Sequence, residues 1–300
     1  MTTGASARFL DPATLGRISS LHLIAKTVVE GFISGLHRSP FLGRTMDFAE
    51  YRAYNPGDDI RQIDWKLYSR TDRFFVKEYE GDTNTNLLLL LDISKSMDFG
   101  TGALTKLDYA RYLVACLAYF SQRQRDRVGL VAFDHRVVVH VPPAAKHYQV
   151  ALHTLEKLEP GGHSDLVPPL IEVAQHARRR GLLVMVSDFY DTPERVVEAV
   201  RGFKTRGHDV ILFHVLDPAE IDLPYDEPVD FLDLESGDRV SVVPDSLREQ
   251  YRRLVQEHVE ELRRRFTQLG IDYTLINTAE PLDNALYRYL AARMWAMKSR

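Results

Sequence analysis

The sequence contains a single cysteine, Cys116, and lacks any apolar run long enough to cross a membrane. One cysteine excludes a disulfide framework within the chain, and a thiol inside an apolar helical pattern favours a reducing compartment. The dense apolar run from Leu87 to Leu91 is far shorter than the ~20 residues of a membrane-spanning helix. The N-terminus also lacks the basic-then-apolar order of a signal peptide. We therefore expect a cytoplasmic protein without a membrane span.

An excess of charge of either sign is also missing. The 38 basic and 42 acidic residues give a net charge of −4, so no overall electrostatic attraction to nucleic acid is expected. Two basic runs, Arg178–Arg180 and Arg263–Arg265, fall where helices are predicted to end, and the helix dipole favours positive charge there. With 45% apolar residues over 300 positions, the chain can form one large α/β domain and a smaller appendage.

Residues 1–84 differ from the remainder and predict an N-terminal helix followed by a β-rich segment. Asp11-Pro12 is typical of a helix start, and apolar residues at helical spacing continue to Leu36. Residues 55–58, Asn-Pro-Gly-Asp, predict a turn, with strands expected at 65–68 and 73–79.

From residue 85 to residue 300, strand and helix patterns alternate. An insertion at about 218–244 predicts two short strands, at 229–234 and 239–243, and Ser246-x-x-Glu249 predicts a capping box for a long helix ending near 269. The fold class expected is α/β: a mostly parallel, Rossmann-like sheet flanked by helices. The other strands are expected at 87–91, 128–133, 137–141, 182–187, 209–215 and 271–276, and the other helices at 106–123, 148–158, 167–180, 193–204 and 282–297.

Oxygen-bearing side chains follow two of these strands and precede one helix. The first strand runs into Asp92-x-Ser94-x-Ser96, and the strand at 182–187 runs into Asp188. Ser164 ends a Gly-Gly-His-Ser loop. Because ligands bind beyond the carboxyl ends of parallel strands, these side chains are candidates for one site. Carboxylates and hydroxyls suit a hard cation such as Mg²⁺. A purely structural role is the alternative, because Asp and Ser also cap helices.

These three loops resemble the metal-ion-dependent adhesion site of von Willebrand factor A domains. The stretches 48–66 and 76–80, together with Asp-Pro-Ala-Glu at 217–220, resemble the domain of unknown function 58 family over nearly the whole chain. The resemblance implies a von Willebrand A-like domain that binds Mg²⁺, or Mn²⁺ or Ca²⁺. The implied ligands are the first-loop residues Asp92, Ser94 and Ser96, the second-loop Ser164, where threonine is common, and the third-loop Asp188, directly or through water.

The same resemblance implies a partner: a MoxR-type AAA+ ATPase, a client protein that offers an acidic residue, or both. The chain has no phosphate loop of its own, because Gly100 to Lys106 lacks the glycine directly before the lysine. The function expected is therefore a non-enzymatic, metal-dependent binding module that acts as an adaptor. The segment from Pro56 to Trp65 would form either a docking surface or an internal ion-pair network.

Two alternatives remain open. A phosphatase-like hydrolase could use the same site, with His163 as a base, although Ser94 stands where such enzymes need a second aspartate. Neither a G-x-S-x-G elbow nor an H-E-x-x-H pair occurs in the sequence, so we expect no enzyme. A scaffold with a degenerate metal site is the other alternative.

Overall fold

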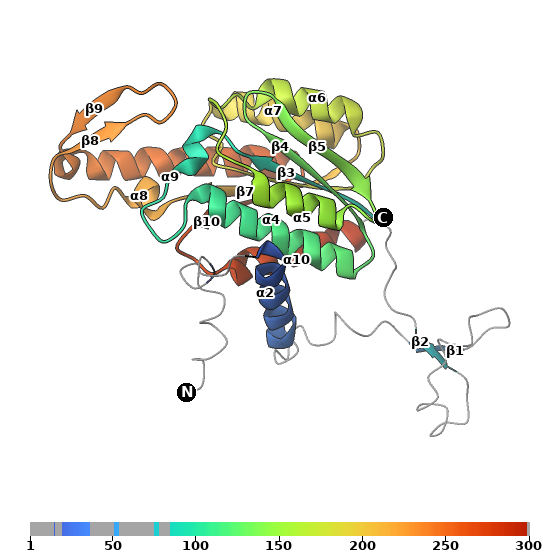
Figure 1. Ribbon diagram of the computed structural model, residues 1–300. Coiled ribbons are helices and arrows are strands. Elements are labelled where there is room, and N and C mark those ends of the chain that lie inside the picture. Colours follow the sequence, from blue (N-terminus) through green and yellow to red (C-terminus); the bar gives the residue numbers. More distant parts are fainter. Residues whose placement is uncertain (1–14, 16–19, 37–50, 54–74, 78–84, 299–300) are drawn as a thin grey trace.

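The computed structural model describes residues 15, 20–36, 51–53, 75–77 and 85–298 (Figure 1). The predicted helix start at Asp11-Pro12, the turn at 55–58, the strand at 65–68 and the Pro56 to Trp65 segment lie outside the described residues.

A six-stranded sheet forms the centre, with the strand order β10-β7-β6-β3-β4-β5. Five strands are parallel, and β5 pairs antiparallel with β4 as the predicted hairpin. The prediction of a mostly parallel sheet is thus confirmed. The strands are β3 (Asn86–Asp92), β4 (Arg127–Phe133), β5 (Val137–Ala144), β6 (Leu182–Ser187), β7 (Asp209–Leu216) and β10 (Asp272–Asn277).

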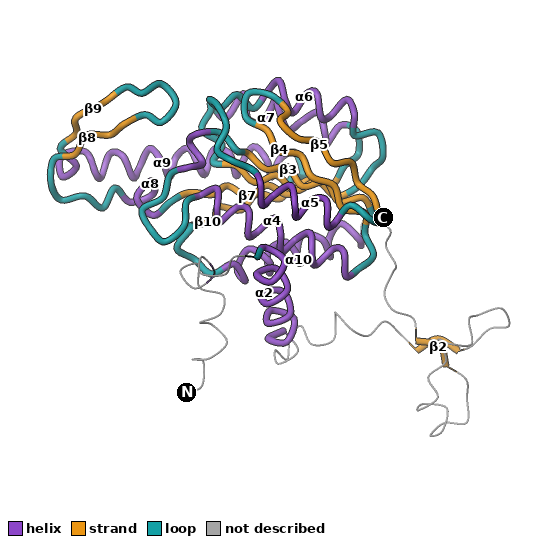
Figure 2. Tube along the Cα trace, viewed as in Figure 1, coloured by secondary structure: helices purple, strands orange, loops and turns teal. Residues whose placement is uncertain are grey.

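Helices cover both faces of this sheet, which explains the unbroken leucine run of β3 (Figure 2). Leu87, Leu89 and Leu91 belong to one core with α2, α4, α5 and α10, whereas Leu88 and Leu90 belong to a second core with α6, α7 and α9. A strand buried on both faces does not alternate in polarity. The helices are α2 (Leu21–Leu36), α4 (Lys106–Arg123), α5 (Tyr148–Lys157), α6 (Val167–His176), α7 (Pro193–Thr205), α9 (Pro244–Gln268) and α10 (Leu282–Lys298).

The helix α2 packs directly on the α/β core. Its buried face joins the same apolar core as α4. Tyr119 donates a hydrogen bond to Glu30 at 3.1 Å, and the His22 ring lies 3.0 Å from the Tyr148 hydroxyl. Of the predicted β-rich segment, the structure describes a short antiparallel pair of strands, β1 (Tyr51–Ala53) and β2 (Phe75–Lys77). The domain boundary at residue 84 stays a prediction.

Two predicted helix boundaries were wrong. The helix α6 ends at His176 rather than at residue 180, so Arg178–Arg180 follow the helix and do not occupy its last turn. The helix α9 begins at Pro244 with Val243 as its N-cap, and the Ser246 hydroxyl donates to the Val243 carbonyl instead of forming a capping box. Proline suits the first helical position because it has no N–H to satisfy.

The predicted insertion contains two strands, β8 (Val229–Leu232) and β9 (Arg239–Val242), paired antiparallel. A short helix that was not predicted, α8 (Pro218–Asp222), precedes them and carries a capping box formed by Asp217 and Glu220. Figure 1 shows the β8–β9 hairpin beside α9, projecting from the sheet's end.

Candidate functional site

The three oxygen-bearing loops meet at the carboxyl edge of the sheet. Ser187, the last residue of β6, donates a hydrogen bond to Asp92 Oδ2 at 2.6 Å, which joins the first and third loops. The Lys95 amide donates to the Gly162 carbonyl at 2.9 Å, which joins the first and second loops. The expected convergence of the loops is therefore observed.

The Gly161-Gly162 pair is required by this close approach. A Cβ on Gly161 would lie 2.7 Å from Asp134 Oδ2 and 3.1 Å from the Ile93 carbonyl oxygen. Asp134 follows β4 and accepts the Gly162 amide at 2.9 Å, so it holds the second loop against the turn between β4 and β5. Glycine at 161 is the residue that lets the two backbones come this close.

The first loop presents two adjacent hydroxyls. The Ser94 Oγ and Ser96 Oγ atoms lie 3.1 Å apart, and Asp92 Oδ1 accepts the Ser94 amide at 2.9 Å. Asp92 and Ser94 are fully buried. The side chain of Ser94 makes no capping bond to the short 3₁₀ helix that follows, and Thr105 caps α4. Helix capping therefore does not account for the loop's hydroxyls.

Asp188, in the third loop, lies against a buried lysine. Lys106, the first residue of α4, donates to Asp188 Oδ2 at 2.8 Å and to Glu220 Oε1 at 2.7 Å. Burial by itself would lower the pKa of Lys106, but the charges of both carboxylates outweigh it and raise that pKa. Lys106 is therefore a fixed positive charge beneath the site.

The carboxylates nevertheless outnumber the ammonium group. With Asp92, Asp188 and Glu220 ionised, three negative charges face one positive charge, a net charge of −2. Burial, followed by the charge of Asp188, raises the pKa of Asp92 from 3.8 to about 7, although hydrogen bonds from Ser187 and Ser94 oppose the shift. A buried cluster with this excess favours either a proton or a cation.

The donor set fits a divalent cation. Asp188 Oδ1 is buried and has no hydrogen-bond partner among the described residues, which is costly for a carboxylate oxygen. The 3.1 Å between the Ser94 and Ser96 hydroxyls matches the separation, roughly 3.0 Å, of neighbouring octahedral ligands of Mg²⁺. Within the described part of the chain, no three His, Cys, Asp or Glu side chains are placed to hold a metal. A cation here would therefore have to use the serine hydroxyls.

The second-loop residue Ser164 is half-buried, and its backbone amide donates to Glu235 Oε1 at 3.0 Å. Glu235 belongs to the turn of the β8–β9 hairpin, so a distant carboxylate reaches this loop. The neighbouring His163 is exposed, and its ring stacks on His135 with 4.5 Å between centroids.

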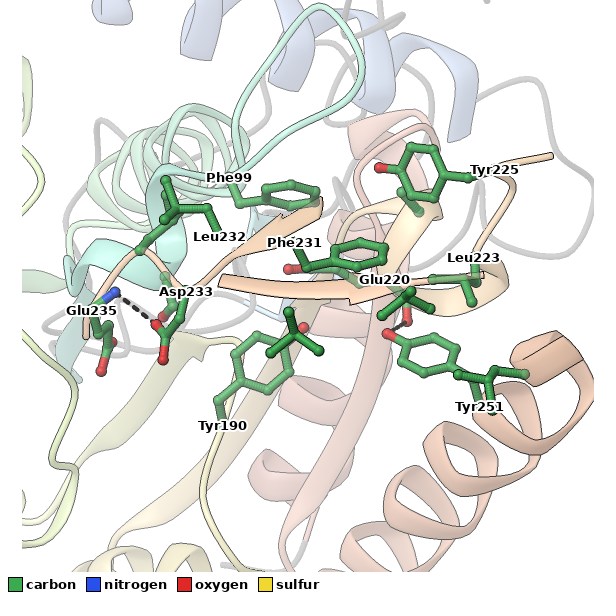
Figure 3. Close-up of a pocket in the computed structure, with 16 residues that line it drawn as sticks. Phe99, Tyr190, Glu220, Leu223, Tyr225, Phe231, Leu232, Asp233, Glu235 and Tyr251 are labelled. Atoms are coloured by element: carbon green, nitrogen blue, oxygen red, sulfur yellow. Dashed lines mark hydrogen bonds between the residues drawn. The ribbon is translucent and has the colours of Figure 1, made fainter. Parts of the chain in front are cut away.

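A cavity of about 610 Å³ separates the hairpin from the body of the molecule. Ser96 and Glu235 line it at the candidate site, and the rings of Tyr190, Tyr225 and Tyr251 line it elsewhere (Figure 3). A mostly apolar cavity of this size that ends in polar groups is typical of a binding site.

The fold and loops define a von Willebrand A-like α/β domain with an inserted hairpin. The chain belongs to the family described as protein of unknown function DUF58, whose model matches residues 50–261. Two relatives are the uncharacterized proteins Mb1516 of Mycobacterium bovis and Rv1480 of Mycobacterium tuberculosis. Each is 28% identical over 94% of this chain and 90% of its own length.

Among solved structures, the chain is similar to BatB from Bacteroides thetaiotaomicron, at 16% identity and a TM-score of 0.49, covering 70% of this chain and 99% of BatB. The SpRpn10 VWA domain matches at 14% identity and a TM-score of 0.40, over 67% of this chain and 92% of that domain. At these identities the likenesses say nothing of activity. No helix among the described residues is long and apolar enough to span a membrane.

Four polar residues around the site were not predicted from the sequence: Lys106, Ser187, Glu220 and Glu235. Ser187 lies directly before the predicted Asp188, and Glu220 lies within the Asp-Pro-Ala-Glu motif, so both carried a signal. Lys106 was interpreted as the start of a helix, and nothing local distinguishes a buried lysine from an exposed one. Glu235 lies 71 positions from its partner Ser164 and carried no local signal.

Proposed function

We propose that this protein is a metal-dependent protein-binding module. Asp92, Ser94, Ser96, Ser164 and Asp188 would hold Mg²⁺, or Mn²⁺ or Ca²⁺, directly or through water. When bound, such an ion supplies a positive centre with a free position for an acidic group of the partner. The observation that carries the proposal is the buried Asp188 Oδ1 atom, which has no hydrogen-bond partner among the described residues. It belongs to the carboxylate whose charge helps to raise the pKa of Asp92.

The chain's own residues prepare this position. Ser187 and the Ser94 amide orient the two oxygens of Asp92, and Lys106 fixes one oxygen of Asp188 while leaving the other available. Ligands held by neighbours in this way lose little entropy when an ion binds. A binding role without catalysis is supported by the first-loop hydroxyls, which hydrogen-bond to each other and, within the described part of the chain, to no base.

The partner proposed is a MoxR-type AAA+ ATPase, or a client protein that offers an acidic residue, with this protein as the adaptor between them. This choice follows from the family resemblance. A cation with an open coordination position would provide a physical means of binding such a partner, because the partner's carboxylate would complete the coordination.

Calorimetric titration with Mg²⁺ tests the metal site, and capture of a purified MoxR-type ATPase with Mg²⁺ or with chelator tests the partner. We expect Asp92→Ala to abolish both the heat of Mg²⁺ binding and the Mg²⁺-dependent capture. Asp226→Ala, at a side chain that is 91% exposed, should change neither. Capture that is equal with Mg²⁺, with chelator and in Asp92→Ala would overturn the metal-mediated interaction.

A scaffold that needs no metal is the second candidate, favoured by the Lys106 ammonium, which already lies 2.8 Å from Asp188 as an internal cation. The titration separates the two functions, because a scaffold would show no heat of binding at millimolar Mg²⁺. A phosphatase-like hydrolase with His163 as base is tested by assaying phosphate-ester cleavage with Mg²⁺. Turnover that is lost in both Asp92→Ala and His163→Ala would establish it in place of the binding module.

A further inference from the structure

The cavity beneath the β8–β9 hairpin is lined by aromatic rings from separate segments of the chain. They come from the loop before α4, the third loop, the insertion and α9, and they are Phe99, Tyr190, Tyr225, Phe231 and Tyr251 (Figure 3). The rings of Tyr225 and Phe231 meet edge to face, with 5.7 Å between centroids. A volume of about 610 Å³ has room for a long side chain and the backbone that carries it.

The walls of this cavity are held in place by hydrogen bonds. Arg248 Nη2, on α9, donates to the Tyr225 carbonyl at 2.7 Å. At the hairpin turn, Glu235 accepts the Ser164 amide at 3.0 Å. The hairpin is therefore a fixed wall of the cavity, and a ligand would enter a site that is already formed. A preformed site loses little conformational entropy when its ligand binds.

The described residues that line the cavity include three carboxylates and no basic side chain. One of them, Glu220, is ion-paired with Lys106 at 2.7 Å. The other two, Asp233 and Glu235, belong to the hairpin turn. Hydrogen bonds from the Glu235 amide, then from the Ser236 hydroxyl and amide, lower the pKa of Asp233, so this carboxylate is ionised at neutral pH. The cavity thus combines aromatic rings with negative charge at the turn.

An organic cation suits this combination. The face of an aromatic ring attracts a cation, and a carboxylate pairs with one. Tyr190 already interacts in this way, because Lys106 Nζ lies 4.6 Å from the centroid of its ring. An acidic ligand would be repelled by Asp233 and Glu235, and an apolar one would cover them without a counter-charge. Arginine fits best, because its planar guanidinium both stacks on rings and pairs with carboxylates.

We propose that this cavity is a second binding site, which receives an arginine side chain of a protein partner while the hairpin stays in place. The guanidinium is recognised by the ring faces and by the carboxylates of the hairpin turn. Ser96 lines the cavity and also belongs to the first loop, so the second site adjoins the candidate metal site. The inference goes beyond the proposed function, because binding of arginine here requires no metal ion.

The test is an NMR titration of the full chain, in chelator, with capped tripeptides whose central residue lies between two alanines. The central residue is arginine, citrulline, which has nearly the same shape without the charge, or norleucine, which is apolar. The citrulline and norleucine peptides should bind roughly tenfold more weakly than the arginine peptide, because they lose the cation–π and ion-pair interactions. Equal or tighter binding of either neutral peptide would overturn the proposal, as would absence of arginine-peptide binding at millimolar concentration.

Variants test whether the peptide binds in the cavity. Tyr251→Leu removes a ring and should weaken arginine-peptide binding roughly fivefold, whereas Tyr251→Phe keeps the ring and should bind like the wild type. Glu235→Gln should also weaken binding, and Glu227→Gln, at an exposed glutamate of the same insertion, should not. Circular dichroism checks that the variants are folded. Unchanged binding in both Tyr251→Leu and Glu235→Gln would overturn the assignment to this cavity.

The outcome is independent of the metal site. Because the peptide titrations contain chelator, preferential binding of the arginine peptide would support the second site whether or not the chain binds Mg²⁺. Absence of Mg²⁺ binding would overturn the proposed function alone, and absence of arginine-peptide binding would overturn the second site alone.

Discussion

The floor and the roof of the candidate site are built in opposite ways. The floor consists of Asp92, Asp188, Lys106 and Glu220. The first three are fully buried and Glu220 is nearly so, and Lys106 forms ion pairs with Asp188 and Glu220. The roof is the β8–β9 hairpin, in which no residue from 229 to 242 is buried and which stands above a cavity. Changes to the floor should therefore affect the stability of the whole chain, whereas changes to the roof should affect binding alone.

The largest effect is expected at Lys106. Lys106→Met leaves Asp188 and Glu220 buried without their shared cation, which should lower the free energy of unfolding by roughly 3–5 kcal/mol. Urea denaturation measures the loss. Adding Asp188→Asn to Lys106→Met should recover part of the lost stability, because the unpaired charge is removed. If the two substitutions instead destabilise the chain additively, residues 106 and 188 are not coupled, which would contradict the account.

The next effect is the pH dependence contributed by Asp92. Burial, then the charge of Asp188, raises its pKa from 3.8 to about 7, so between these values the folded chain holds a proton that the unfolded chain has lost. The free energy of unfolding in chelator should therefore fall as the pH rises, by roughly 2 kcal/mol between pH 5 and pH 7, and level off above pH 7.

Asp92→Asn is the matched variant, because asparagine keeps the shape and removes the titration. Subtracting its urea-denaturation curve from that of the wild type at each pH isolates the contribution of Asp92. A difference that stays constant from pH 5 to pH 8 would contradict the account.

A smaller effect is expected where the second loop meets the first. Gly161→Ala introduces a Cβ 2.7 Å from Asp134 Oδ2, so the loop must shift, at a cost of about 1–2 kcal/mol. Gly102→Ala is the control, since a Cβ there meets nothing within 4 Å. Thermal unfolding compares the two variants, and equal melting temperatures would show that the close approach is not needed.

The smallest effect belongs to the roof. Val240→Ser changes a side chain that is 59% exposed, and the free energy of unfolding should change by less than about 0.5 kcal/mol. Urea denaturation measures it beside Lys106→Met. A loss comparable to that of Lys106→Met would show that the hairpin belongs to the cooperative core, and the contrast between floor and roof would fail.

Much of this architecture followed from the sequence because its signals are local. The leucine run at 87–91 predicted a strand buried on both faces, and the structure shows odd and even leucines in two separate cores. Asp92 and Asp188 were predicted to meet because both follow parallel strands, and β3 and β6 are indeed neighbours. The boundary errors have local causes too, since Pro244 starts its helix before the serine that was expected to cap it.

What the sequence did not predict depends on contacts between distant segments. The ion pairs of Lys106 join α4 to the third loop, 82 positions away, and to α8, 114 positions away. Glu235 reaches Ser164 only because the hairpin folds back over the sheet edge. Neither residue differs from ordinary surface charge when only its neighbours in sequence are considered.

The central claim is that the floor, with its net charge of −2, holds a divalent cation. Calorimetric titration of the wild type and Asp92→Ala with Mg²⁺ at pH 8, where Asp92 is ionised, tests it most directly. The account predicts binding of one ion per chain in the wild type and none at this site in Asp92→Ala. Absence of heat in the wild type at millimolar Mg²⁺, or equal binding by the two proteins, would contradict it.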